Sequence, residues 1–169
     1  KSVAYFPEMK LDNLHQRGRK YADGGRLLSN GEDNASAVYA TIVRTFADDR
    51  QAAIRLQETI DKAMRKSFEE NKSREYSDLA VSLAASLPEK SSGIFGICGD
   101  VYYANNLLLS SDGYNAAAMY ARALKADNSN DHARKQLFTI VAEIKNRLAG
   151  ISDRDERRAL VRTARSNFP

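Results

Sequence analysis

The chain has 169 residues, 26 basic and 22 acidic side chains, and a net charge of +4. Its apolar content of 43% with only three prolines excludes a disordered chain, and no apolar run reaches the roughly 20 residues needed to span a bilayer. One cysteine, Cys98, and two histidines without metal-ligand spacing, His15 and His132, exclude an internal disulfide and indicate no metal site. We therefore expect a soluble, mostly helical module with no cofactor.

Apolar residues at three- and four-residue spacing predict four helices in the first half of the chain. They cover about 11–28, 35–46, 50–68 and 73–87. Asp33 or Asn34 is the expected N-cap of the second helix, and Asp48 and Asp49 suit the N-terminus of the third.

The second half follows the same order after a connector around 90–93. Its helices are expected over about 94–109, 115–126, 131–148 and from Ser152 to Asn167. Gly150 is a plausible C-cap, and Ser152 with Asp155 resembles a capping box that opens the last helix. No segment alternates with period two, so no sheet is expected.

The two halves are similar to each other at a shift of 81 residues. The matched positions include residue types that helix composition alone does not supply: Gly18 and Gly99, Tyr21 and Tyr102, Asn34 and Asn115, Tyr39 and Tyr120, and Pro7 and Pro88. We therefore predict an all-α chain of two tandem four-helix units, 1–88 and 89–169. The units are expected to form one continuous right-handed array of about eight antiparallel helices.

The first two helices of each unit resemble a tetratricopeptide repeat. That family carries a Gly followed three residues later by a Tyr, as in Gly18 and Tyr21 or Gly99 and Tyr102, and small residues around an aromatic such as Tyr120. The family's Trp and closing Pro are absent here, and about five residues are inserted between the helices. The resemblance implies stacked helical hairpins and a non-enzymatic scaffold that binds a protein or peptide on its concave face.

A second, looser resemblance concerns the stretch from Gly25 to Tyr39. It is similar to hairpins in accessory regions of bacterial membrane-anchored regulators, including some Ser/Thr kinases. This resemblance implies a fragment of a larger bacterial protein, with a periplasmic location beside an anchor in the parent chain; a cytoplasmic location is the alternative.

Residues that depart from the repeat are the better candidates for partner contacts, because the repeat does not explain them. Tyr103 and Tyr114 stand where the first unit has Ala22 and Asp33. We expect six residues to contact a protein or peptide partner: Tyr103, Asn106, Tyr114, Arg26, Asn30 and Arg122. Self-association of the array is a close variant of this prediction.

The last predicted helix is basic. Arg154, Arg158, Arg162 and Arg165 fall at spacings of four, four and three residues, which places them in one stripe. This stripe could bind nucleic acid or another anionic surface, or an acidic partner. The alternative is a polar cap that closes the end of the array. No interleaving of aromatic and basic residues of the RNA-binding type occurs, so nucleic acid is the less favoured partner.

Catalytic interpretations have little support in the sequence. Neither histidine lies in a nucleophile motif, and both are expected to be exposed or to act near helix caps. Cys98 lies in an apolar run and is expected in the core. The carboxylates of Asp48, Asp49, Glu69 and Glu70 could form a glycosidase pair only if folding brought two of them into a cleft.

Overall fold

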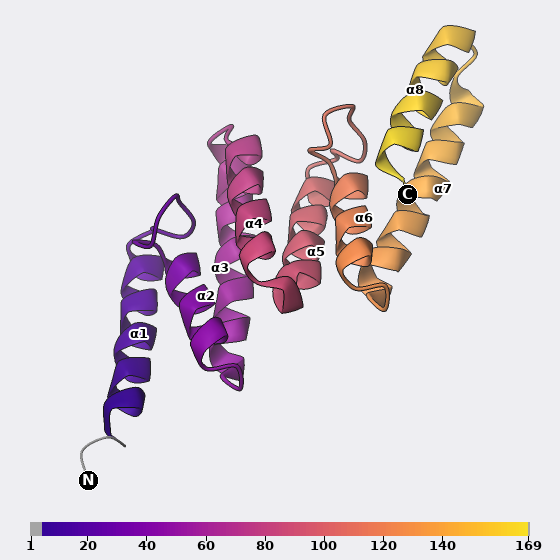
Figure 1. Cartoon of the computed structure of the whole chain (residues 1–169). Helices are drawn as coiled ribbons and strands as arrows, with labels where there is room; N and C mark the ends of the chain where they lie inside the picture. The colour runs from indigo at the N-terminus through magenta and orange to yellow at the C-terminus, as the bar shows by residue number, and fades with distance from the viewer. Residues whose placement is uncertain (1–4, 169) are drawn as a thin grey trace. The chain divides into compact units, whose positions relative to one another are not determined.

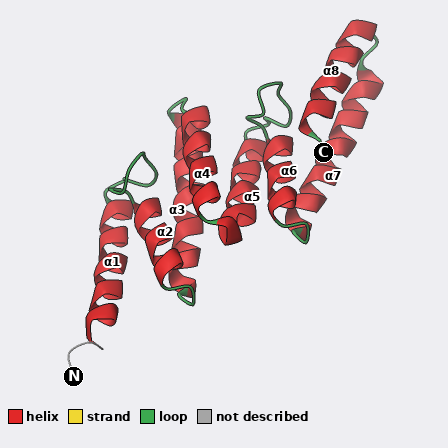
Figure 2. Ribbon diagram, in the orientation of Figure 1, coloured by secondary structure: helices red, strands yellow, loops and turns green. Residues whose placement is uncertain are grey.

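The computed structural model describes residues 5–168, and these residues form eight α-helices and no strand (Figure 2). The all-α prediction is confirmed. Contacts divide the chain into two compact units, with the division between Leu87 and Pro88. Each unit contains four helices, and a continuous array of both units stays a prediction.

Unit 1 consists of α1 (Tyr5–Asp23), α2 (Ala35–Thr45), α3 (Arg50–Glu69) and α4 (Ser73–Ser86). Consecutive helices of this unit run antiparallel (Figure 1). The α2 helix lies in the core because nearly every residue on its inner side is apolar and buried. These residues are Ala35, Val38, Tyr39, Ala40, Ile42 and Val43.

Unit 2 consists of α5 (Pro88–Ala104), α6 (Ala116–Ala126), α7 (Asp131–Gly150) and α8 (Arg154–Asn167). The bounds of α6, α7 and α8 lie 81 residues after those of α2, α3 and α4 at both ends. The local structure therefore repeats with the same period as the sequence.

The caps of equivalent helices use equivalent residues. The side chain of Asn34 accepts a hydrogen bond from the N–H of Ala37 at 3.0 Å, and Asn115 accepts one from Ala118 at 3.0 Å. Each satisfies a backbone donor that the first turn of a helix leaves without an intrahelical partner. Of the two N-caps that the sequence offered for α2, the structure uses Asn34.

In each unit a glycine of the first helix packs directly against a tyrosine ring of the second. Tyr39 is 1% exposed and Tyr120 is 0% exposed. A Cβ atom added at Gly18 would lie 2.8 Å from a ring carbon of Tyr39, and one added at Gly99 would lie 2.6 Å from a ring carbon of Tyr120. Only glycine leaves room for these rings against the first helix, so the matched Gly and Tyr positions are explained by packing.

The predicted bounds of the first helix of each unit, 11–28 and 94–109, are wrong. The α1 helix ends at Asp23, because Gly25 takes a left-handed conformation with φ of 73° and the N–H of Arg26 bonds to the carbonyl of Tyr21. Asn106 ends α5 in the same way with φ of 58°. The predicted connector at 90–93 lies inside α5, which starts at Pro88, a residue that suits a first helical position.

Two smaller predictions also need correction. Gly150 is the last residue of α7 rather than a cap beyond it, and the residue that caps α8 is Asp153, which accepts from the N–H groups of Asp155 and Glu156. Of the two expectations for the histidines, exposure or a place near a helix cap, His15 meets the second. It is 9% accessible, and its Nε2 lies 2.7 Å from the carboxylate of Asp49, the N-cap of α3.

Candidate functional site

The α8 helix is attached to unit 2 mainly by its C-terminal end. Asn167 is the buried residue of this helix. Asn115 donates to the side-chain oxygen of Asn167 at 2.7 Å, and Asn167 donates to the carbonyl of Ser110 at 2.8 Å. These bonds fix the end of α8 beside the start of α6. The remaining residues of α8 are half-buried or exposed.

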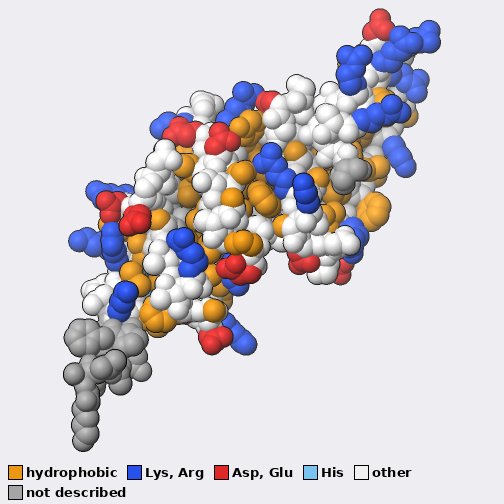
Figure 3. Space-filling view, viewed as in Figure 1, with side chains coloured by type: hydrophobic (Ala, Val, Ile, Leu, Met, Phe, Trp, Pro, Cys, Tyr) orange, Lys and Arg blue, Asp and Glu red, His pale blue; other side chains and the backbone are white. Residues whose placement is uncertain are grey.

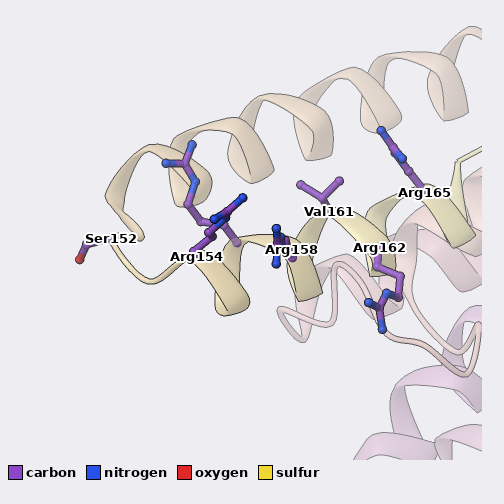
Figure 4. Close-up of a pocket in the computed structure, with 7 residues that line it drawn as sticks. Ser152, Arg154, Arg158, Val161, Arg162 and Arg165 are labelled. Atoms are coloured by element: carbon purple, nitrogen blue, oxygen red, sulfur yellow. The ribbon is translucent and has the colours of Figure 1, made fainter.

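A groove of about 580 Å³ runs along the exposed side of α8 (Figure 4). Its lining consists of five arginines, one serine and one valine: Ser152, Arg154, Arg157, Arg158, Val161, Arg162 and Arg165. We call this the arginine groove. All four arginines of the stripe predicted from the sequence line it. Val161 provides an apolar surface between Arg158 and Arg165 (Figure 4).

The charge of the arginine groove is largely uncompensated. The α8 helix holds five arginines against Asp155 and Glu156, a net charge of +3 out of the chain's +4. Basic side chains gather over α8 in the space-filling view (Figure 3). Arg158 lies 3.6 Å from Asp155, but these side chains are 61% and 91% exposed, so solvent screens the pair strongly.

The other four arginines of the groove form no ion pair with any residue that the structure describes. They are Arg154, Arg157, Arg162 and Arg165. Guanidinium groups held close together without counter-charges repel one another, and an anion that binds among them relieves this repulsion.

The repeat shows how far α8 has diverged from its equivalent helix. The buried residues of α4 are the small residues Ser77, Ala80 and Ala84. The residues 81 positions later are Arg158, Val161 and Arg165, and the two arginines are exposed. The helix face that unit 1 buries with small side chains is therefore the charged face of unit 2.

This groove can bind anions but offers no groups for acid–base or metal chemistry. Arginine stays protonated at all physiological pH values and presents a planar set of donors that matches carboxylate and phosphate oxygens. Among the described residues, no group of three or more His, Cys, Asp or Glu side chains could hold a metal ion. Burial raises the pKa of the Cys98 thiol to about 12, so this cysteine is a protonated core residue.

Two of the predicted partner-binding residues lie together near the end of α5. The N–H of Asn106 donates to the carbonyl of Tyr103 at 2.9 Å. The Tyr103 hydroxyl donates to Glu143 of α7 at 2.6 Å, and Arg147 of α7 lies 3.4 Å from the Asn106 side chain. Both residues thus have partners inside unit 2.

The other four predicted contacts do not form one site with this pair. Tyr114 is half-buried in the loop before α6, where its N–H donates to Asp112, and Arg122 is exposed on α6. Arg26 and Asn30 belong to the loop after α1 in unit 1. The guanidinium of Arg26 lies 5.8 Å from the ring centre of Tyr21, which gives it a cation–π contact.

Sequence reasoning missed several residues of the exposed surface. Arg157 and Val161 line the arginine groove, and Arg157 could have been included because it lies one turn after Arg154. Phe138 of α7 is 69% exposed, and its equivalent in unit 1 is Gln57.

No part of the described chain forms a helix long and apolar enough to cross a membrane.

No protein-family model matches this chain, and no significant similarity to a curated protein or to a solved structure is found.

Proposed function

We propose that the chain is a non-enzymatic interaction module, a tetratricopeptide-like scaffold, that binds an acidic segment of a partner protein along the arginine groove. The observation that carries the proposal is the row of arginines on α8, four of which have no ion-pair partner among the described residues. The expected binding of a peptide on a concave face stays a prediction.

The scaffold part of the proposal is supported by the equivalent packing of the two units. Gly18 with Tyr39 and Gly99 with Tyr120 make the close helix contacts that the tetratricopeptide resemblance implies. In repeats of this kind the matched residues stabilise the fold, which leaves the unmatched surface residues free to recognise a partner.

The composition of the groove favours a protein segment over a nucleic acid. Val161 can contact an apolar side chain of a peptide, a contact that a phosphate backbone does not offer. Asp153, Asp155 and Glu156 stand at one end of the helix, where they repel a continuous phosphate backbone. The groove lining contains no aromatic side chain on which a base could stack.

The proposal is tested with a labelled helical peptide that carries glutamates at the same four-, four- and three-residue spacing as the arginine stripe. Fluorescence anisotropy should show saturable binding to the full chain, and a peptide with glutamine at those positions should not bind. The variant Arg158→Glu should weaken binding at least tenfold, whereas Tyr114→Ala should leave it unchanged. Equal binding of both peptides, or loss with Tyr114→Ala alone, would contradict the proposal.

The same assay separates the nucleic-acid alternative, which the net charge of α8 also favours. A labelled duplex that binds more tightly than the acidic peptide, with an affinity that falls about 100-fold or more as salt rises severalfold, would replace the proposal with a nucleic-acid interface.

A further inference from the structure

Unit 1 contains a small polar cleft of about 170 Å³ between α1, α2 and α3. It lies at the end of α1 and is separate from the arginine groove of unit 2. Its walls carry both charged and apolar side chains: Arg19, Ala22, Asp23, Leu27, Tyr39, Arg55, Glu58, Thr59 and Lys62. We call it the Tyr39 cleft. It has room for one side chain or small anion, well below the roughly 300–1,000 Å³ of drug-sized pockets.

The hydroxyl group of Tyr39 has no partner in this cleft. Tyr39 is 1% exposed, yet its hydroxyl makes no hydrogen bond with any residue that the structure describes. The hydroxyl oxygen is not excluded from solvent, because Ser36 is the described residue with a fully buried and unpartnered side-chain oxygen. The Tyr39 hydroxyl is therefore accessible from the cleft and can donate to a group that enters it. Burial also raises the pKa of Tyr39, with opposing effects from Arg55 and Arg19, so the hydroxyl is a proton donor at neutral pH.

Unit 2 shows which group satisfies this hydroxyl. Tyr120, the equivalent of Tyr39, donates to the carboxylate of Asp100 at 2.6 Å. The position of Asp100 is occupied in unit 1 by Arg19. Unit 1 has therefore replaced the internal carboxylate with a cation and left the tyrosine donor in place.

A second pair of differences between the two units creates the space of the Tyr39 cleft. Tyr103 of unit 2, whose hydroxyl donates to Glu143 at 2.6 Å, corresponds to Ala22 of unit 1, and Glu143 corresponds to Lys62. The aromatic ring and the second carboxylate of unit 2 are thus replaced by a methyl group and another cation. Ala22 and Lys62 both line the Tyr39 cleft.

The side chains that line the cleft carry a surplus of one positive charge. Arg55 and Glu58 form an ion pair at 3.0 Å and so compensate each other. Of the other charged residues that line the cleft, Arg19 and Lys62 are positive and Asp23 is negative. None of these three side chains forms an ion pair with a described residue. A singly charged anion neutralises the surplus of one positive charge, whereas a doubly charged phosphate exceeds it.

We propose that the Tyr39 cleft is a carboxylate-binding site, in which the Tyr39 hydroxyl donates to an external carboxylate and the guanidinium of Arg19 pairs with it. The carboxylate takes the role that Asp100 has beside Tyr120. Both an acidic side chain of a bound protein and a free small carboxylate present this group.

The site is tested by NMR titration of the full chain with N-acetylglutamate methylamide, a mimic of a glutamate side chain in a peptide. Saturable shift changes are expected at the amides of Ala22, Tyr39 and Thr59. The glutamine analogue should cause none of them. Acetate in a parallel titration distinguishes the sources, because weaker saturation by acetate points to a peptide side chain and equal saturation points to a free carboxylate.

Two variants of unit 1 should remove the effect. Tyr39→Phe deletes only a hydroxyl without a partner, so the chain should fold normally while carboxylate binding falls about tenfold or more. Ala22→Tyr should abolish binding, because it introduces the ring that Tyr103 places in unit 2. The matched control is Tyr120→Phe, which should lower stability but retain carboxylate binding.

The outcomes separate this inference from the proposed function. Arg158→Glu should leave the carboxylate titration unchanged, because the arginine groove is a different site. The inference is overturned if the glutamine analogue shifts the same amides, if Tyr39→Phe binds as the unaltered chain does, or if inorganic phosphate binds more tightly than the glutamate probe.

Discussion

Gly99 lies directly against the ring of Tyr120, so that a Cβ atom at position 99 would stand 2.6 Å from the ring carbon Cε1. Such a distance is too short for any real contact of a Cβ atom, and the ring is fully buried and cannot turn away freely. The first and second helices of unit 2 approach each other closely because of this pair. Gly18 and Tyr39 repeat the relationship in unit 1.

Replacement of Gly99 by alanine should therefore destabilise the protein by about 1–3 kcal/mol, the usual cost of overpacking. Gly96→Ala on the same helix is the matched control, because a Cβ atom there meets nothing within 4 Å. It should be neutral or stabilising by about 0.5–1 kcal/mol, since alanine favours the helix over glycine. Urea denaturation of both variants measures the difference, and equal stabilities would contradict the packing argument.

Replacement of Ser36 should change the free energy of unfolding in the opposite direction to that of Gly99. Its side chain is 0% exposed, and its hydroxyl has no hydrogen-bond partner among the described residues. The equivalent residue in unit 2 is Ala117, which is also fully buried. Ser36→Ala should therefore be neutral or raise the free energy of unfolding by up to about 1 kcal/mol. A loss of more than about 1 kcal/mol in thermal or urea unfolding would show that the hydroxyl has a partner.

Asp49 should make the stability of the protein depend on pH. Burial acts to raise the pKa of Asp49, but hydrogen bonds from the N–H of Ala52 and from His15 outweigh it and lower that pKa. Because the folded pKa lies below the unfolded value of about 4, the contribution of Asp49 is fully present above that value. It is lost as the pH falls through the folded pKa.

The free energy of unfolding, measured from near-neutral to acidic pH, tests this dependence. The destabilisation caused by Asp49→Asn should shrink as the pH falls below about 4. Asn130, the equivalent cap in unit 2, does not titrate, so Asn130→Ala should cost about the same at every pH within the folded range. A pH-independent effect of Asp49→Asn would disprove the role of the charge.

The sequence predicted the fold well where local chemistry and the repeat agree. Asn34 was one of the two residues expected to cap α2, and the structure uses it. Asn115, expected as the first residue of its helix, is the matching N-cap of α6. The spacing of Arg154, Arg158, Arg162 and Arg165 predicted one face of one helix, which requires no knowledge of the rest of the fold. The ends of α1 and α5 were missed because the left-handed conformations of Gly25 and Asn106 stop each helix before the leucines that the predicted bounds included.

Contacts between helices distant in the chain could not be predicted in this way. The bond from Tyr103 to Glu143 joins residues 40 positions apart, and its absence from unit 1 is what opens the Tyr39 cleft. The hydroxyl of Tyr39 has no partner because Arg19 stands where Asp100 would be, a difference that has meaning only once the two units are compared in three dimensions. The part-buried contact between His15 and Asp49 was missed for the same reason.

The most direct test of the proposed function is a charge swap between α8 and its acidic peptide. The variant Arg158→Glu should lose binding to the glutamate peptide, and a peptide with lysine at the position opposite Arg158 should bind the variant again within about threefold of the original affinity. The unaltered chain should bind the lysine peptide poorly. Failure of the lysine peptide to restore binding, with the variant still folded, would contradict the claim that α8 recognises an acidic partner.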